Sequence, residues 1–301
     1  MRSDLIQEQI PLHNLTSWRV GGKAQYFCSP RTIEEVEGAV KWSHENKMNL
    51  TILGGGSNSL ISDKGIGGLV LSMRGLAGLD VKEADGRLQI VAMAGTHKSQ
   101  LLRIFIQRRL APALFLSGLP GDVGGGVVMN AGVSEDRVPK EFCEIVDWVE
   151  VVRVDGGTTR REQISAAQIE WSYRHSKGWQ PGVLVRVGLS WPLEVDEEIP
   201  SRVKEANRLR LSKQPLDQPS CGSVFVNPPG YKAGAVIDKC GLKGFSIGGA
   251  VVSPKHANFI VNSGQATASD VEAVIQHVKK TVFDLTKIEL KTEVIYLGDW
   301  S

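Results

Sequence analysis

The chain has 301 residues, of which 42% are hydrophobic and 23% are charged, a balance that is ordinary for a globular protein of two or three lobes. Its formal net charge of +2 provides no basic footprint of the kind that nucleic-acid binding requires. The sequence contains no run of 18 apolar residues, so no membrane span is predicted. The four cysteines lack the CxxC spacing of a zinc site, so we expect no metal.

The N-terminal segment is polar and has no apolar core of the signal-peptide type. The cysteines are scattered along the chain, at positions 28, 143, 221 and 240, which is typical of reduced thiols in a reducing compartment. We therefore expect a cytoplasmic protein.

The first part of the chain is predicted to alternate helices with short strands. Thr32 and Glu35 have the spacing of a capping box and precede a helix that runs to about residue 46. An apolar strand over 49–53 leads directly into a glycine cluster. Further strands are predicted at 69–72, 89–93, 149–154 and 183–189, and a further helix at 98–110.

An acidic run at 196–198 is poorly suited to a core and indicates a boundary. Beyond it we predict a helix through Val203 and Leu209 and a helix over 269–285, with Ser269 and Asp270 as its capping residues. A strand over 288–297 closes the chain. The pattern predicts an α+β protein with two domains, 1–195 and 196–301.

Two glycine-rich segments are candidates for binding a dinucleotide, because a pyrophosphate needs backbone N–H groups that no side chain obstructs. One follows the strand at 49–53, and the other has five glycines and a proline within 118–126. Neither has the spacing of a Rossmann fingerprint or of a phosphate loop. A tight turn and a hinged lid are the structural alternatives. The predicted cofactor-binding residues are Gly54, Gly55, Gly56, Ser57, Asn58, Gly118, Pro120, Gly121, Gly124 and Gly125.

Ser223 is the most informative single residue of the second part. It stands between Gly222 and a β-favouring Val-Phe pair, and Asn227-Pro228 ends the run. Such a serine is held firmly at the mouth of an element, although a serine beside glycine is most often only a turn residue.

In their order and separation, several motifs resemble those of the UDP-N-acetylenolpyruvoylglucosamine reductases, in the shorter of the family's two subtypes. The motifs are 14–24, the two glycine segments, 129–132, 173–176, 220–228, 241–244, 256–262 and 290–294. The resemblance implies an FAD-binding region of the vanillyl-alcohol-oxidase type, followed by a smaller α+β substrate domain. It also implies a monomer with NADPH and a UDP sugar as substrates, and neither nucleic acid nor a membrane as a partner. Because the glycine segments contain no histidine or cysteine tether, we expect non-covalent FAD.

The resemblance also implies roles for individual residues. Arg174 would hold the substrate carboxylate, Ser223 would donate a proton, and Glu293 would assist that donation. Lys213 and Asn227 match positions that contact the substrate diphosphate. The alternatives are a surface arginine, a turn serine, a solvent-facing strand carboxylate, a solvated lysine and a turn asparagine.

The chain departs from the family pattern at three positions. Gly126 stands where alanine is usual, Val226 where a basic or polar residue is common, and Thr292 where proline is frequent. Val226 cannot contact a phosphate, which puts substrate affinity in question. His175 and His256 match no catalytic position of the family, and we expect them to be structural.

Two other functions are compatible with parts of the pattern. One is an FAD oxidase of the same fold that acts on another alcohol or sugar, and the other is a non-catalytic nucleotide-sugar binding protein. The combination of Arg174, Ser223 and Glu293 argues against both.

Overall fold

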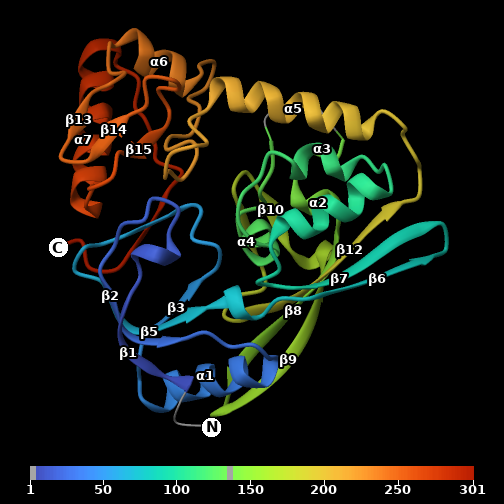
Figure 1. The fold of residues 1–301 in the computed structure, drawn as a ribbon. Coiled ribbons are helices and arrows are strands. Elements are labelled where there is room, and N and C mark those ends of the chain that lie inside the picture. The colour runs from blue at the N-terminus through green and yellow to red at the C-terminus, as the bar shows by residue number, and fades with distance from the viewer. Residues whose placement is uncertain (1–4, 134–137) are drawn as a thin grey trace. The chain divides into compact units, whose positions relative to one another are not determined.

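The computed structural model describes residues 5–133 and 138–301, and this part of the chain forms two compact units (Figure 1). The first unit contains the described parts of 1–7, 26–55 and 68–209, and the second contains 8–25, 56–67 and 210–301. The units therefore differ from the contiguous division expected at residue 195. Apolar packing explains the difference, because Trp18, Val20 and Leu60 are buried in the second core together with C-terminal residues.

The first unit is built on a five-stranded antiparallel sheet of order β6-β7-β12-β8-β9. Its strands are β6 (Leu79–Ala84), β7 (Arg87–Met93), β8 (Val146–Asp155), β9 (Thr158–Ser165) and β12 (Val183–Pro192). The helices of the unit are α1 (Ile33–Glu45), α2 (Lys98–Gln107), α3 (Pro112–Leu116), α4 (Val123–Val128) and most of α5 (Ile199–Lys213). Figure 1 shows α1 beside β9 and α2 beside α3, and these pairs are in contact.

Shorter elements complete the chain. A four-stranded sheet has the order β1 (Gln7–Pro11), β2 (Lys23–Cys28), β5 (Ile66–Ser72) and β3 (Leu50–Leu53), with β3 and β5 parallel. A hairpin joins β10 (Glu170–Ser172) to β11 (His175–Lys177). Single 3₁₀ turns occur at His13–Leu15, Met73–Gly75, Phe142–Glu144 and Ala166–Gln168.

The second unit packs helices on a small antiparallel sheet. The sheet contains β13 (Ser246–Ile247), β14 (Ala250–Val252) and β15 (Ile260–Asn262), and the helices are α6 (Ala233–Lys239) and α7 (Ala268–Thr286). A parallel pair joins β4 (Ser59–Ile61) to β16 (Ile295–Leu297). Both units mix helices with mainly antiparallel sheets, which confirms the predicted α+β class. No helix in the described part of the chain is long and apolar enough to cross a membrane.

The predicted capping of α1 is half right. The Thr32 hydroxyl accepts a hydrogen bond from the Glu35 N–H at 3.2 Å, as a capping box requires. The Glu35 carboxylate, however, accepts from the N–H of Arg31 at 2.6 Å and not from that of Thr32. At α7, Thr267 is the N-cap and forms a capping box with Asp270, so the prediction of Ser269 as a capping residue is wrong.

Two predicted elements are shorter in the structure. Helix α2 ends at Gln107 rather than at residue 110, because Arg109 has a φ of +55°, which a right-handed helix does not tolerate. The predicted strand over 288–297 is reduced to β16 and an isolated bridge between Thr292 and Phe225. The segment before β16 pairs with the residues after Ser223 instead of extending the strand.

Gly126 lies in α4 directly against a core aromatic ring. A Cβ at this position would come within 2.5 Å of Phe142 Cζ, and Phe142 is fully buried. Phe142 also packs edge-on against Phe115, with 5.9 Å between ring centroids. Because Gly126 has no side chain, where the family usually has alanine, the Phe142 ring can occupy the space that a methyl group would fill.

We predict that Gly126→Ala lowers the free energy of unfolding by about 1–3 kcal/mol, the usual cost of overpacking a core. Urea unfolding measures the change. The double variant with Phe142→Leu tests the cause, since a smaller side chain leaves room for the added methyl group. Its loss should fall short of the sum of the two single losses by at least about 0.5 kcal/mol. Additive losses would contradict the proposed contact.

Candidate functional site

The two predicted glycine segments meet in the first unit. Gly54 directly follows β3, as expected. A Cβ on Gly54 would lie 2.6 Å from Asp122 Oδ2, and a Cβ on Gly55 would lie 2.9 Å from the Cα of Gly121. Real Cβ atoms do not approach other atoms this closely, so the contact between the two segments requires glycine at both positions. We call this contact, made by Gly54 and Gly55 with Gly121 and Asp122, the loop junction.

The second glycine segment is only partly a loop. It was expected to run through residue 126, but α4 begins at Val123, so Gly124 and Gly125 are helical. Asp122 is the N-cap of α4, and its Oδ1 accepts a hydrogen bond from the Gly125 N–H at 2.6 Å. Gly124 lies against the backbone of residue 94, where a Cβ would be 3.0 Å from the carbonyl oxygen. Packing therefore explains Gly124 without a ligand.

Gly118 and Pro120 precede the loop junction without being part of it. A Cβ on Gly118 would lie 3.0 Å from Val133 Cγ1, so this glycine packs on a neighbouring side chain. Pro120 is exposed to solvent. Gly121 has a φ of +90°, a backbone conformation that favours glycine.

Asp122 is a buried charge at the loop junction, with only 4% of its surface exposed. Burial raises the pKa of its carboxyl group, while the hydrogen bond from Gly125 and the charge of Lys98 act in the opposite direction. Oδ2 has no hydrogen bond of normal geometry to the described residues, although the nearby Gly55 N–H also lowers the pKa. The Arg74 side chain donates to the Gly55 carbonyl at 2.8 Å, so a positive charge also contacts the junction.

Lys98, whose backbone N–H contacts Gly121 of the loop junction, is a buried charge that the sequence analysis missed. It opens α2 and is 4% exposed, and burial lowers its pKa to about 8. A signal was present, because residue 98 precedes Leu101 by three positions and Phe105 by seven, which places it on the buried stripe of the helix. Lysine at such a position is exceptional.

Arg174 occupies the turn of the β10–β11 hairpin, whose last paired residues are Ser172 and His175. It has a φ of +54°, an unusual conformation for a residue other than glycine. The guanidinium lies 4.6 Å from the centroid of the Tyr173 ring and donates to the Gly132 carbonyl at 2.8 Å. The half-buried Arg174 side chain is therefore oriented by a ring and a carbonyl, in contrast to an unconstrained surface arginine.

The end of the first glycine segment belongs to the second unit. Gly56 has a φ of +63° and lies against the carbonyl of Leu15, which excludes a side chain. Ser57 is half-buried. Asn58 donates from Nδ2 to the Glu293 carbonyl at 2.9 Å, and its own carbonyl accepts from the Ile295 N–H at 2.9 Å. The observed contacts of Asn58 thus hold the segment that carries Glu293.

Ser223 and Glu293 lie on two backbone segments that pair with each other. The Glu293 N–H donates to the carbonyl of Val224 at 2.8 Å, and the Val226 N–H donates to the carbonyl of Lys291 at 2.9 Å. Ser223 is exposed and Glu293 is half-buried. The pairing brings the backbone of Glu293 beside the residue that follows Ser223. The described unit therefore brings these two predicted residues together.

Asn258 fixes the position of the Ser223 segment. It is 4% exposed, and its side-chain amide pairs with the Phe225 backbone: Oδ1 accepts from the N–H and Nδ2 donates to the carbonyl, each at 2.9 Å. The Asn258 carbonyl also accepts from the Val224 N–H at 2.9 Å. The Asn258 amide thus makes the hydrogen bonds to Phe225 that a neighbouring strand would otherwise make. The sequence showed only that Asn258 lies within a family motif.

The remaining predicted residues are more exposed. Lys213 is exposed at the end of α5, and Asn227 is exposed while its Oδ1 accepts from the Ala233 N–H at 2.9 Å, at the start of α6. His175 is exposed on β11. Burial lowers the pKa of His256, whose ring packs edge-on against Phe259 at 4.8 Å.

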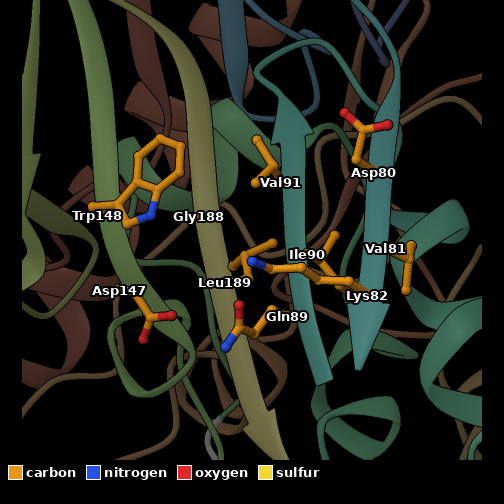
Figure 2. A pocket seen from close by; sticks show the side chains of 10 residues that line it. All are labelled: Asp80, Val81, Lys82, Gln89, Ile90, Val91, Asp147, Trp148, Gly188 and Leu189. Atoms are coloured by element: carbon orange, nitrogen blue, oxygen red, sulfur yellow. The ribbon is translucent and has the colours of Figure 1, made fainter. Parts of the chain in front are cut away.

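A hollow of about 260 Å³ lies on the five-stranded sheet, apart from the predicted site residues (Figure 2). Trp148 lies beside the Gly188 backbone in Figure 2, and a Cβ on Gly188 would collide with the indole. None of the predicted cofactor, substrate or catalytic residues lines this hollow.

The comparison with protein families assigns the chain first to a class. A model described as an FAD binding domain matches residues 24–161, a range that includes the whole loop junction. The chain is therefore an FAD-binding flavoprotein. A second model, the C-terminal domain of UDP-N-acetylenolpyruvoylglucosamine reductase, matches residues 214–297, the range that contains Ser223 and Glu293.

Nearly full-length relatives identify the family. The chain is 38% identical to a UDP-N-acetylenolpyruvoylglucosamine reductase of Synechococcus sp. (strain RCC307), over 97% of this chain and 94% of that protein. It is 38% identical to one of Listeria innocua, over 96% and 94% respectively. The crystal structure of the reductase from Thermus caldophilus matches with a TM-score of 0.80 and 31% identity, covering 97% of this chain and 99% of that one. The chain belongs to the UDP-N-acetylenolpyruvoylglucosamine reductase family.

The residues of the first unit fit an FAD site. The loop junction presents backbone without side chains, as close approach of a dinucleotide requires. The buried Asp122 Oδ2 atom, which has no hydrogen bond of normal geometry to the described residues, is a polar group of the kind that a bound polar molecule can satisfy. Gly54, Gly55 and Gly121 are the residues that would hold the cofactor through their backbone.

We predict that Asn258→Ala lowers the free energy of unfolding by about 2–4 kcal/mol, because it leaves the buried N–H and C=O of Phe225 without partners. Urea unfolding of the purified protein measures the loss. Asn46→Ala is the matched control, since Asn46 is exposed and its side chain donates a single hydrogen bond, to Trp42 O at 2.8 Å. A loss at Asn258 no larger than that at Asn46 would show that the Phe225 backbone does not depend on the amide.

Proposed function

We propose that the chain is an NADPH-dependent, FAD-mediated reductase of UDP-N-acetylglucosamine enolpyruvate, which it converts to UDP-N-acetylmuramate for peptidoglycan precursor synthesis in the cytoplasm. The observation that carries the proposal is the family membership over nearly the whole chain. The fit of the loop junction to FAD supports it. NADPH as the preferred reductant, a monomeric state and the roles of single residues are parts of this proposal.

Bound FAD, once reduced by NADPH, would supply the hydride that is added to one carbon of the enolpyruvyl double bond. Negative charge then develops on the neighbouring carbon and spreads into its carboxylate, so the protein must hold the carboxylate and deliver a proton. We assign the first task to Arg174, because a guanidinium binds a carboxylate with two parallel hydrogen bonds. Its contacts with Tyr173 and Gly132 restrict the orientation of the side chain before substrate arrives.

We assign proton delivery to Ser223. Its hydroxyl is exposed and therefore accessible to substrate, while the buried Val224 and Phe225 and the amide of Asn258 hold its backbone. A serine hydroxyl is a weak acid, so it needs a neighbour that assists the transfer. Glu293 has this role in the proposal, and the backbone pairing described above supports it.

Lys213 and Asn227 are proposed to bind the diphosphate of the UDP sugar. Both are exposed, and a lysine ammonium and an asparagine amide can each donate hydrogen bonds to phosphate oxygens. The Asn227 Oδ1 atom accepts a hydrogen bond from the Ala233 N–H at the start of α6. This bond fixes the amide plane and therefore the direction of the Nδ2 donor.

We predict that Ser223→Ala separates the two half-reactions. Reduction of the flavin by NADPH needs no proton from Ser223 and should proceed at the normal rate. Its reoxidation by the enolpyruvyl sugar should slow by at least about 10²-fold, in the range typical of a lost general acid. Rapid mixing under anaerobic conditions, followed at the flavin absorbance, measures each step, and Glu293→Gln should impair the same one.

The control variant is Ser263→Ala, another exposed serine of the second unit, whose hydroxyl donates to Gly249 O at 2.9 Å. It should leave both half-reactions unchanged. Normal reoxidation in Ser223→Ala would reduce Ser223 to a turn residue and remove it from the chemistry.

We predict that Lys213→Ala raises the KM for the UDP sugar by about tenfold, because it removes a charged hydrogen bond to the diphosphate. The rate of flavin reduction by NADPH should stay constant. Lys204→Ala, which changes an exposed lysine on the same helix, is the control and should change neither quantity. An equal effect of Lys213→Ala on both half-reactions would count against diphosphate binding.

A further inference from the structure

Two buried charges of opposite sign lie close together, one within the loop junction and one beside it, without forming an ion pair. Lys98 and Asp122 are each 4% exposed, and their charges affect one another's ionisation. Within the described residues, no ion pair within 4.0 Å and no hydrogen bond involves the Lys98 ammonium. A buried charge is normally in direct contact with an opposite charge, so a buried lysine without such a contact is unusual.

The position of Lys98 is tied to the loop junction by its backbone. Its N–H donates to the Gly121 carbonyl at 3.0 Å, and the Val123 N–H donates to the carbonyl of Thr96 at 2.9 Å. The Lys98 ammonium lies 5.5 Å from the centroid of the Phe142 ring, a distance at which a cation is attracted to an aromatic face. Hydrogen bonds of the residues before and after Asp122 thus join the start of α4 to the start of α2.

The charged groups that face this pair are few. Asp122 stabilises the charged form of Lys98, whereas Arg174 and burial act against it. Around Asp122, the charges of Lys98 and Arg74 and the N–H groups of Gly125 and Gly55 favour the carboxylate, whereas burial disfavours it. The Lys98 charge is the larger of the two cationic contributions at Asp122.

Ionisation of Asp122 matters to both glycine segments. Its carboxylate accepts the charge-assisted hydrogen bond from Gly125 at 2.6 Å, which is stronger than a bond to a neutral acid. The other oxygen lies over Gly54, where a Cβ would be 2.6 Å away. If the carboxylate took up a proton, this oxygen would have to accommodate a hydrogen atom or turn away.

We propose that Lys98 is a positioning residue of the cofactor site: its buried ammonium compensates the negative charge of Asp122 at the loop junction and thereby makes the affinity for FAD depend on the charge of Lys98. The proposal rests on FAD as the cofactor. It assigns to Lys98 an action through Asp122 and no direct part in the chemistry.

The sign of the pH dependence follows from the ionisation of Lys98. Burial lowers its pKa to about 8, so the free site loses this charge as the pH rises through about 8. Asp122 then remains negatively charged without its main counter-charge, and this charge disfavours the anionic diphosphate of FAD, so the affinity for FAD should fall. Linked sites commonly change one another's affinity by about 5–150-fold, and we expect a weakening of about tenfold between pH 7 and pH 9.5.

The test is serial dilution of the holoenzyme, with the fluorescence of released FAD giving the dissociation constant at each pH. In the wild type this dissociation constant should rise about tenfold between pH 7 and pH 9.5, with most of the rise above pH 8. In Lys98→Met it should already be raised at pH 7 and should not vary further with pH. Lys82→Met, an exposed lysine on β6, should behave as the wild type. Melting in excess FAD identifies folded variants, and a wild type that carries no FAD would refute the cofactor premise separately.

A double-mutant cycle with Asp122→Asn tests whether Lys98 acts through Asp122. In the Asp122→Asn background, Lys98→Met should change FAD affinity less than about threefold, because the negative charge that Lys98 compensates is absent. Additive effects of the two changes would overturn the proposal. So would a Lys98→Met enzyme that retains the wild-type pH profile, and this second criterion stands even if Asp122→Asn does not fold.

Discussion

The candidate cofactor site depends on a contact that only glycine permits. Gly54 and Gly55 lie so close to Gly121 and Asp122 that a single added methyl group would collide with the opposite segment. The contact joins the end of β3 to the start of α4, and Asp122 caps that helix from the same position. The candidate site for the dinucleotide thus consists of backbone that is held in place by its own packing.

This contact changes the physical interpretation of the glycine content. Glycine costs conformational entropy on folding, and a ligand that touches backbone is one reason to accept that cost. In this protein several glycines also have reasons within the fold: Gly126 leaves space for Phe142, and Gly56 has a left-handed backbone against Leu15. Loop packing alone therefore accounts for these glycines, and the proposed contact of the loop junction with FAD would place the same demand on the sequence.

Local patterns predicted much of the fold and named most residues of the candidate site. The helix at α1, the strand before Gly54 and the positions of the glycine segments follow from periodicity and composition over short windows. What local patterns could not provide depends on partners distant in the sequence. The residues before β16 pair with the Ser223 segment, and Asn258 replaces a strand beside Phe225. Lys98 was overlooked because lysine is normally exposed, although its helical position indicated burial.

The central claim is that the chain passes reducing equivalents from NADPH to an enolpyruvyl UDP sugar through bound FAD. An anaerobic titration tests it most directly: NADPH should bleach the flavin absorbance, and UDP-N-acetylglucosamine enolpyruvate should restore it without oxygen, with one UDP-N-acetylmuramate formed per flavin reoxidised. A flavin that NADPH does not bleach, or that recovers its colour only when oxygen is admitted, would contradict the account.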